Sequence, residues 1–363
     1  MGKYLKMLMV DWLSVLIAFP HNSPINGGNV FSIDANGVEE WRVDKKMQVE
    51  GSYSATVQLR SESRDFPCSH LRLDGNLVKF MQGHNVWGSS DIHGLITASL
   101  SRILSKLNQS FDINLLSLYV LNGKISRLDI TAMYDLENHR QVLAWIRAAS
   151  DSASMQYRGR GQFSGNTLYW GKHSRRWSLK MYPKGEELKA HRPKQGISDH
   201  PQHLKSVTDF ADRALRVELV LRGMELERIG LSQVQSWNDS KLEKVYSSYL
   251  SGLEFSENMK AISGISDLEK LPPRLRACAL AWSDGHDLRL LYPRASWYRY
   301  KKQIFECIGL DISLPPPKDC KTTNVIPLFS VLEAKPMCIP SWAYGTHLYF
   351  EPPIYSRNFQ LVK

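Results

Sequence analysis

The chain has 363 residues, a formal net charge of +10, 43% hydrophobic residues and 10% aromatic residues. This length suggests two domains, and the composition excludes a disordered or low-complexity chain. The five cysteines (68, 278, 307, 320 and 338) form no CxxC pair, which argues against a disulfide framework or a zinc ribbon and favours a reducing cytoplasm. A basic chain suits a polyanionic partner, nucleic acid before an acidic membrane face.

The first apolar run, Met7 to Phe19, follows Lys3 and Lys6 and so superficially matches a signal peptide. Asp11 interrupts the run, no small-residue cleavage site follows, and strand-forming residues favour a buried strand over 9–19. No apolar stretch is long enough for a transmembrane helix, so no membrane association is expected.

Further along the chain, hydrophobic periodicity predicts alternating strands and helices. Strands are expected at 53–60, 70–80, 124–134, 167–171, 177–182 and 215–222. Helices are expected from Ser90 and over 137–149, and 186–208 is expected to combine a helix edge with a mobile loop. From about Met224 the pattern is helical, interrupted by prolines at 272–273 and 315–317. We therefore predict an α+β domain over 9–223, a mostly antiparallel sheet with helices on one face. A mainly helical domain is predicted over 224–363, and a helix-turn-helix is one arrangement that would fit it.

The positive charge is concentrated in one window, residues 156–205. It holds eleven Lys or Arg and three acids, a net +8 of the chain's +10. Aromatic residues alternate with these charges: Tyr157, Phe163, Tyr169, Trp170, Trp177 and Tyr182. Basic groups bind phosphates and aromatic rings stack on unpaired bases, so this window favours nucleic-acid binding over a merely solvated basic loop.

Two predicted strands carry a carboxylate among apolar neighbours. On the strand at 124–134, Arg127, Asp129 and Thr131 share one face, and on the strand at 215–222, Arg216 and Glu218 do so. Two such carboxylates are hard oxygen ligands suited to Mg²⁺ or Mn²⁺. The alternative in each case is an ordinary Arg–carboxylate ion pair.

A tyrosine ends the predicted strand at 177–182. Tyr182 has Lys180 and Lys184 as neighbours and precedes Pro183, which forces a turn. A phenol with its ordinary pKa near 10 is a poor nucleophile at neutral pH, but a cation and a metal would stabilise the phenolate. The alternative is a structural core tyrosine.

Seven segments of the chain, taken together, resemble one family. They are MVDWLSV (9–15), FMQGHNVWGSSDI (80–92), ISRLDIT (125–131), LKMYPKGEEL (179–188), LRVEL (215–219), PRASWYRYKKQIFECIGLDI (293–312) and NVIPL (324–328). The family is the filamentous bacteriophage replication initiator, the gene-two-type nicking and joining endonuclease. QGHNVWG is the most specific segment. The trio around Asp129, Tyr182 and Glu218 also resembles the carboxylate-type rolling-circle initiators of plasmids. Residues 1–8 then look like an extension.

The resemblance implies residue roles and a reaction. Asp129 and Glu218 would hold Mg²⁺ (or Mn²⁺), Tyr182 would attack the plus strand of supercoiled replicative-form DNA at the origin, and Lys184 would be catalytic. The product would be a 5′-phosphotyrosine and a free 3′-hydroxyl, and the displaced strand would later be recircularised. The chain has no His-hydrophobic-His pair, and Pro183 stands where plasmid relatives have an acid, so the third ligand stays open between Glu186 and Glu187.

The implied partners are phage origin DNA, double-stranded and as the displaced single strand, in the cytoplasm of the bacterial host. Host helicase, polymerase and single-strand-binding protein are implied as well. Cations expected to contact DNA are Arg127, Arg158, Arg160, Lys172, Arg175, Arg176, Lys180 and Arg216.

The helical part has its own basic-aromatic segment at 294–302. Trp297, Ile304 and Ile308 are predicted on one face, and Arg299 and Lys302 on another. Such a helix would suit either duplex DNA or plain solvation. Two other functions stay open for the whole chain: a non-catalytic nucleic-acid-binding regulator, and a metal nuclease that uses water and forms no covalent intermediate.

Overall fold

The computed structural model describes residues 8–51, 53, 55–62, 68–155, 158–190, 201–255, 268, 270–283, 286, 288–308, 312 and 336–355. The chain divides into two compact units, Met1–Glu254 together with Leu328–Lys363, and Phe255–Pro327. Each unit is described by itself below. In the part of the chain described here, no helix is long and apolar enough to cross a membrane.

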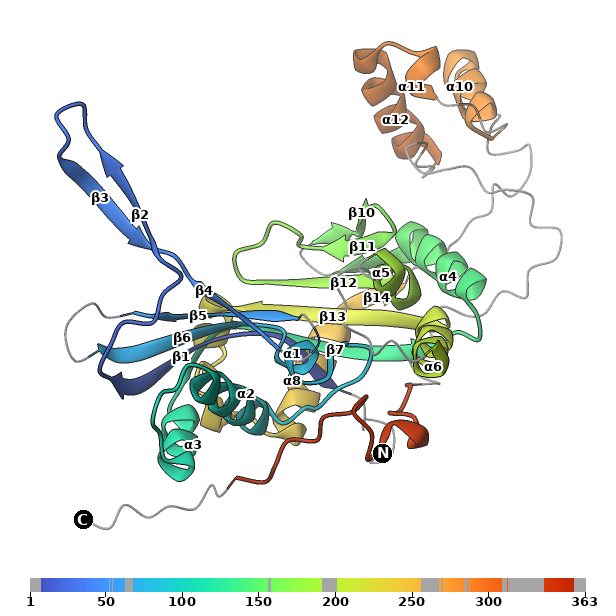
Figure 1. The fold of residues 1–363 in the computed structure, drawn as a ribbon. Helices are drawn as coiled ribbons and strands as arrows, with labels where there is room; N and C mark the ends of the chain where they lie inside the picture. Colours follow the sequence, from blue (N-terminus) through green and yellow to red (C-terminus); the bar gives the residue numbers. More distant parts are fainter. Residues whose placement is uncertain are drawn as a thin grey trace. The chain divides into compact units, whose positions relative to one another are not determined.

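The first unit is built on a nine-stranded sheet in the order β10-β11-β12-β13-β7-β1-β6-β5-β4. Figure 1 shows the strands of this sheet with helices beside them. Every neighbouring pair in it is antiparallel, which confirms the predicted α+β fold with a mostly antiparallel sheet. The strands are β1 (Met9–His21), β4 (Met47–Glu50), β5 (Thr56–Ser61), β6 (Cys68–Gly75), β7 (Lys124–Asp135), β10 (Gln162–Ser164), β11 (Thr167–Trp170), β12 (Trp177–Pro183) and β13 (Ala214–Arg222).

The three central strands β7, β1 and β13 are enclosed on both faces. Along β13, eight consecutive positions from Ala214 to Leu221 are buried, and β1 and β7 contain similar buried runs. A strand with one solvated face would alternate buried and exposed residues, so other elements must cover both sides here. A charged side chain within these buried runs is therefore withdrawn from bulk water, which raises the cost of leaving it unpaired.

Helices and short connections complete this unit. They are α1 (Leu77–Gln82), α2 (Ile92–Lys106), α3 (Ile113–Leu121), α4 (His139–Ser152), α5 (Lys184–Ala190), α6 (Pro201–Asp212), α7 (Gly223–Arg228), α8 (Asp239–Leu250) and the 3₁₀ turns η2 (Val234–Ser236) and η3 (Ser341–Ala343). A two-stranded hairpin, β2 (Asn29–Ile33) with β3 (Glu39–Asp44), and a three-stranded sheet of β14 (Leu253–Phe255), β8 (Ala153–Met155) and β9 (Gly159–Arg160) are additional. The periodicity had indicated neither of these small sheets.

The strand predicted over 70–80 ends earlier than expected. It stops at Gly75, whose φ of +152° suits glycine and whose Cα lies too close to Val57 for a side chain. The Asn76 side chain then accepts a hydrogen bond from the backbone N–H of Lys79 and caps α1. The next predicted helix begins one residue later than expected, because Asp91 rather than Ser90 is its N-cap.

The second unit is helical and contains α10 (Pro273–Ser283), α11 (Leu288–Leu291) and α12 (Arg294–Ile308). Trp297 and Ile304 of α12 are buried as their spacing predicts, Tyr300 is buried beside them, and Ile308 is partly buried. Arg299 and Lys302 are exposed.

The units divide at a different place from the boundary expected at 223/224. The helices α7 and α8 belong to the first unit, as do residues 336–355. Backbone hydrogen bonds account for this, since Ile125 donates to Ser232 and Val234 donates to Gly123 along the edge of β7. Pro336 forms an isolated bridge with Tyr134 at the other end of that strand.

Candidate active site

Strand register brings the predicted catalytic side chains to one face of the sheet. Lys180 of β12 pairs with Glu218 of β13, which pairs with Thr131 of β7. Tyr182 pairs with Arg216 in the same way. Directly opposed residues of antiparallel strands point to the same side, so all five share one face.

The same face extends along β7 and onto β1. Asp129 and Arg127 lie two and four positions from Thr131 on β7 and so share its face. Met9 of β1 pairs with Thr131, and Asp11 follows two residues later. The face therefore carries the carboxylates of three adjacent strands, Asp11, Asp129 and Glu218.

The tyrosine is held by one of these carboxylates. The Tyr182 hydroxyl donates to Glu218 Oε2 at 3.0 Å, and Lys180 Nζ lies 2.6 Å from Glu218 Oε1. Glu218 is 1% exposed and Tyr182 8% exposed. Burial raises the pKa of the Tyr182 phenol well above its ordinary value, although the Arg216 charge works against that shift. The Arg216 charge does act to lower the pKa of the phenol, as expected of a cationic neighbour. Burial has the larger, opposite effect, so the phenol stays protonated.

The second carboxylate, Asp129, is paired with an arginine on its own strand. Arg127 donates to both carboxylate oxygens of Asp129, at 2.9 and 2.7 Å. Burial raises the pKa of Asp129 to about 7, and the negative charge of Glu218 contributes to that rise against the opposing effect of Arg127. The negative charge of Glu218 therefore disfavours ionisation of Asp129, the expected effect of one carboxylate on a neighbouring one.

The two carboxylates fit a divalent cation by their chemistry. No group of three His, Cys, Asp or Glu side chains suited to a metal occurs among the residues described here. Mg²⁺, however, is commonly held by one or two carboxylates and completes its shell with water and substrate phosphate oxygens. Asp129 and Glu218, which lie on adjacent strands and on one face, supply such a pair.

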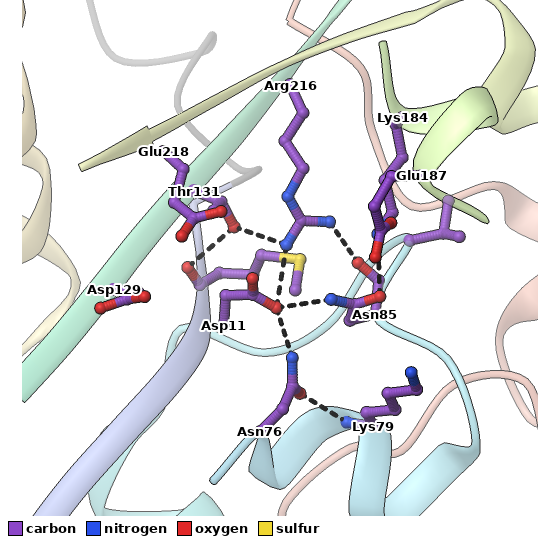
Figure 2. Close-up of polar contacts among 12 residues, drawn as sticks. Asp11, Asn76, Lys79, Asn85, Asp129, Thr131, Lys184, Glu187, Arg216 and Glu218 are labelled. Carbon is purple, nitrogen blue, oxygen red and sulfur yellow. Dashed lines mark hydrogen bonds and ion pairs between the residues drawn. The ribbon is translucent and has the colours of Figure 1, made fainter. Parts of the chain in front are cut away.

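A buried polar network adjoins this pair and is drawn in Figure 2. Its centre is Asp11, whose Oδ1 lies 3.0 Å from Arg216 Nη2 and accepts hydrogen bonds from Asn76 and Asn85. Arg216 also donates to the backbone carbonyl of Asn85 and, at 3.4 Å, to Thr131 Oγ1. Burial opposes ionisation of Asp11, but Arg216 and Lys184 hold its pKa below its ordinary value.

The Arg216 side chain has one unused donor. Within the described part of the chain, its Nε is buried with no hydrogen-bond partner. Leaving a buried donor unsatisfied costs about 1–3 kcal/mol, so an acceptor for this atom would be stabilising.

Lys184 lies in the network with no solvent exposure. Its Nζ donates to Asn85 Oδ1 at 2.8 Å and also pairs with Glu187. Burial and the neighbouring Arg216 charge lower the pKa of Lys184 to about 8. The two residues considered for the third metal ligand therefore differ in their contacts. Glu187 belongs to the network, whereas Glu186 contacts His139 and Asn166.

The predicted DNA-contacting cations fall into two groups. Arg127, Lys180 and Arg216 belong to the buried face described above. The others lie around β9–β12: Arg160, Lys172, Arg175 and Arg176 are exposed and Arg158 is partly buried. Lys172 Nζ donates to Ser164 Oγ at 2.8 Å, and the Arg158 guanidinium lies 3.9 Å from the centre of the Trp177 ring. Residues 156–157 and 191–200 of the basic window, Tyr157 included, lie outside the described residues.

The two tryptophans suggested for base stacking differ in the structure. Trp170 is 1% exposed, so it is a core residue and offers no ring to a base. Trp177 is partly exposed and lies between Arg158 and the edge of Tyr249. Phe163 on the edge strand β10 is the more exposed ring, at 45%.

Asp11, Asn85 and Lys79 are site residues that sequence reasoning did not single out. Lys79 is partly buried beside the network, and burial lowers its pKa against the charges of Glu187 and Asp11 (Figure 2). One signal was available for Asp11, a lone carboxylate inside a strongly apolar strand. Asn85 stands in QGHNVWG, but nothing in that segment by itself says what the amide contacts.

Fold and site together define an α+β protein that gathers a tyrosine, carboxylates and cations on one face of an antiparallel sheet. The family model for the N-terminal part of replication-associated protein G2P matches residues 9–240, and the model for its C-terminal part matches residues 264–349. The chain therefore belongs to the family of replication-associated protein G2P, as the resemblance had indicated.

Curated relatives agree with this assignment. Replication-associated protein G2P of Enterobacteria phage I2-2 is 33% identical over 339 residues, which cover 92% of this chain and 96% of the relative. The protein of the same name from Enterobacteria phage M13 is 25% identical over 375 residues, 86% of this chain and 88% of the relative. Among solved structures, a rolling-circle replication initiator protein from Geobacillus stearothermophilus is matched with a TM-score of 0.32 and 13% identity, over 70% of this chain and 89% of that chain.

Proposed function

We propose that this protein initiates phage DNA replication by nicking one strand of double-stranded replicative-form DNA at the origin and later rejoining the displaced strand. The observation that carries the proposal is the hydrogen bond from the Tyr182 hydroxyl to Glu218, 3.0 Å long, on a face that also presents Lys180. Membership of the replication-associated protein G2P family supports it.

The proposed reaction is a transesterification at a single phosphodiester. The Tyr182 oxygen forms a bond to phosphorus, the bond from phosphorus to the 3′ oxygen breaks, and the products are a 5′-phosphotyrosine and a free 3′-hydroxyl. The phenolic proton passes to Glu218, which already accepts the hydrogen bond. The departing 3′ oxygen takes a proton from solvent. Because the phosphotyrosine conserves the bond energy, rejoining the strand requires no nucleotide cofactor.

The buried cations provide for the charge on the phosphate. Arg216 Nε lacks an acceptor, and Lys184 lies within the same network. Both charges are fixed by carboxylates before any substrate arrives, so they need no rearrangement when charge develops on the phosphate oxygens. Host polymerase would then extend the 3′-hydroxyl, with host helicase and single-strand-binding protein acting on the displaced strand.

Asp129 and Glu218 are proposed to hold Mg²⁺ or Mn²⁺. Such an ion, when bound, polarises a phosphoryl oxygen. The raised pKa of Asp129 supports this assignment, because the site favours an added positive charge there. Glu187 and Asp11 are the remaining carboxylates near this pair, and both are committed to cations of the network.

The test is Tyr182→Phe on supercoiled origin DNA. The substitution removes the hydroxyl and keeps the buried ring, so we expect cleavage and the covalent protein–DNA adduct to disappear while binding of origin DNA stays within about twofold. Tyr169→Phe, on the neighbouring strand β11, is the matched control and should keep both. A denaturing gel with and without protease detects the adduct.

The outcome separates the three functions that the sequence left open. An adduct formed by Tyr182→Phe would assign the nucleophile to another tyrosine. Metal-dependent cleavage with no adduct in the unsubstituted protein would identify a water-using nuclease. Binding without cleavage under any metal condition would identify a non-catalytic regulator.

A further inference from the structure

The loop between α1 and α2, which carries QGHNVWG, inserts one side chain into the polar network. Asn85 is 7% exposed and contacts three charged residues (Figure 2). Its Nδ2 donates to Asp11 Oδ1 at 2.8 Å, its Oδ1 accepts from Lys184 Nζ at 2.8 Å, and its backbone carbonyl accepts from Arg216. One residue thus joins a carboxylate, an ammonium and a guanidinium.

The chemistry of these partners fixes the orientation of the amide. A carboxylate can only accept, so Asn85 must present its NH₂ group to Asp11, and an ammonium can only donate, so the amide oxygen must face Lys184. No other uncharged side chain of this size offers a donor and an acceptor at opposite corners. Aspartate in the same place would set two carboxylates against each other.

The opposite side of this loop is bonded to the segment Pro336–Phe350. His84 Nε2 and Trp87 Nε1 both donate to the carbonyl of Leu348, each at 2.9 Å. Gln82, at the end of α1, accepts from the N–H of Phe350 at 2.8 Å and donates to the Trp87 carbonyl at 2.7 Å. The three bonds to Leu348 and Phe350 join positions more than 260 residues apart.

Apolar packing also holds this loop against residues 336–350. Trp87 is 1% exposed and packs with Phe210, Met337 and Leu348 in one buried cluster, and its ring meets that of Trp342 at a centroid distance of 5.3 Å. Met337 additionally donates its N–H to the Met133 carbonyl on β7. The loop is therefore fixed between the reactive face and a segment that follows the helical unit in the chain.

We propose that the QGHNVWG loop is a positioning element, in which Asn85 sets Lys184 and Arg216 beside the nucleophile and residues 336–350 hold the loop in register. The proposal rests on the proposed function for the role of those cations. In the chain, the helical unit then separates two parts of the first unit, and the segment that follows it supports the loop from the side away from the reactive face. Asn85 acts through its neighbours and touches no reacting atom.

The test is Trp87→Phe in the full chain, which removes the indole donor to Leu348 and keeps an aromatic ring. Trp237→Phe is the matched control, because Trp237 is likewise buried and its Nε1 likewise donates to a backbone carbonyl, that of Leu231, at 2.9 Å. Trp87→Phe is expected to slow single-turnover cleavage at saturating DNA by about tenfold to a hundredfold, with the Kd for origin DNA within about twofold. Trp237→Phe should change neither quantity.

A second readout needs no cleavage. Lys184 has no solvent exposure, so an amine-directed acylating reagent should modify it slowly, and Trp87→Phe should increase that rate at least about tenfold. The half-exposed Lys189 in the same helix is the internal standard and should react equally in all variants. If Trp87→Phe does not fold by circular dichroism, Asn85→Ala replaces it with the same expectations.

The results distinguish this proposal from the proposed function. Unchanged Lys184 modification in Trp87→Phe, or equal slowing of cleavage by Trp87→Phe and Trp237→Phe, would overturn the positioning role. If the unsubstituted protein forms no adduct but Lys184 modification still rises in Trp87→Phe alone, the loop does hold the lysine and the proposed reaction is what fails.

Discussion

The reactive face and the exposed basic loops differ in what their cations contact. On the face, Arg127, Lys180 and Arg216 are each matched to a buried carboxylate at 2.6–3.0 Å. Around β10 and β11, by contrast, Lys172 contacts a serine hydroxyl and Arg158 an indole ring. The first group is fixed by charge pairing before DNA arrives, and the second keeps its charge available to solvent.

Under the proposed function, this difference would let one basic chain separate chemistry from binding. A buried cation paired to an acid contributes little to long-range attraction, because the pair is nearly neutral from outside, but it holds its geometry. An exposed cation releases counterions when it meets a phosphate and adds affinity without precise geometry. Substitutions on the face should therefore change the rate, and substitutions on the loops should change the affinity and its salt dependence.

Among substitutions that keep the Tyr182 hydroxyl, the largest effect is expected for Glu218→Gln. The amide keeps the shape of the side chain but removes the charge that pairs with Lys180 and the basic group that we propose accepts the proton of Tyr182. We expect the rate of cleavage at saturating DNA to fall by about 10²–10⁴-fold, the range attributed to positioned acid–base groups. Rapid-quench measurement of the nicked product provides the rate, and filter binding the affinity.

Glu225→Gln is the control for loss of a buried ion pair. Glu225 is 1% exposed and pairs with Arg228 at 2.6 Å, yet it lies on α7. If its substitution slowed cleavage as much as Glu218→Gln, general destabilisation rather than chemistry would explain both. If Glu218→Gln lowered the affinity for DNA instead of the cleavage rate, the assignment of chemistry to the face and of binding to the loops would be wrong.

The two-residue period of strands was sufficient to group the residues of this face within each strand, whereas joining the strands into one site rested on the family resemblance. Arg127, Asp129 and Thr131 had to share a side, as did Arg216 and Glu218, and Tyr182 was placed at the end of a third strand. The order of the strands was not available in this way. Asp11 joins the site only because β1 is the neighbour of β7, a pairing between residues more than 100 positions apart.

The raised pKa of Asp129 should make the stability of the protein depend on pH. The folded-state pKa is about 7 and the unfolded value is near 3.8, so between these pH values the folded chain binds a proton that the unfolded chain has lost. Metal-free protein should therefore lose stability as the pH rises from about 4 to about 7. In Asp129→Asn, which cannot ionise there, this part of the pH dependence should vanish, as measured by urea unfolding across that range.

Urea unfolding with added Mg²⁺ or Mn²⁺ tests whether Asp129 holds the metal. At pH 8, where Asp129 is ionised, adding the metal should stabilise the unsubstituted protein, by about 2.7 kcal/mol at a hundred times its Kd, and should not stabilise Asp129→Asn. Asp74→Asn removes another buried carboxylate of the sheet, one paired with Lys46, and should keep the metal effect. Equal metal stabilisation in Asp129→Asn would remove Asp129 from the metal site.

The pairings that make the face work were beyond sequence reasoning for a physical reason. Whether Trp170 faces DNA or the core depends on what covers its strand, and its near-zero exposure is set by distant elements. The contacts of Asn85 arise from β1, β13 and α5 meeting at one loop, and the bond from His84 to Leu348 spans 264 positions. Short motifs identify such residues as unusual, but only the fold decides their partners.

The smallest effect is expected for Arg175→Ala combined with Arg176→Ala in the connection before β12. Both side chains are exposed, so their loss should leave the cleavage rate at saturating DNA within about twofold. Each phosphate contact contributes about 0.9 to the slope of log affinity against log salt on duplex DNA, so the slope should become shallower by about 1.8. Lys241→Ala with Lys244→Ala removes the same charge from exposed positions on α8 and controls for net charge alone.

An unchanged slope in the arginine variant would exclude both residues from the DNA footprint. A large fall in the saturated rate would mean that the exposed loops, too, take part in positioning the scissile phosphate, and the division between a face for chemistry and loops for binding would not hold.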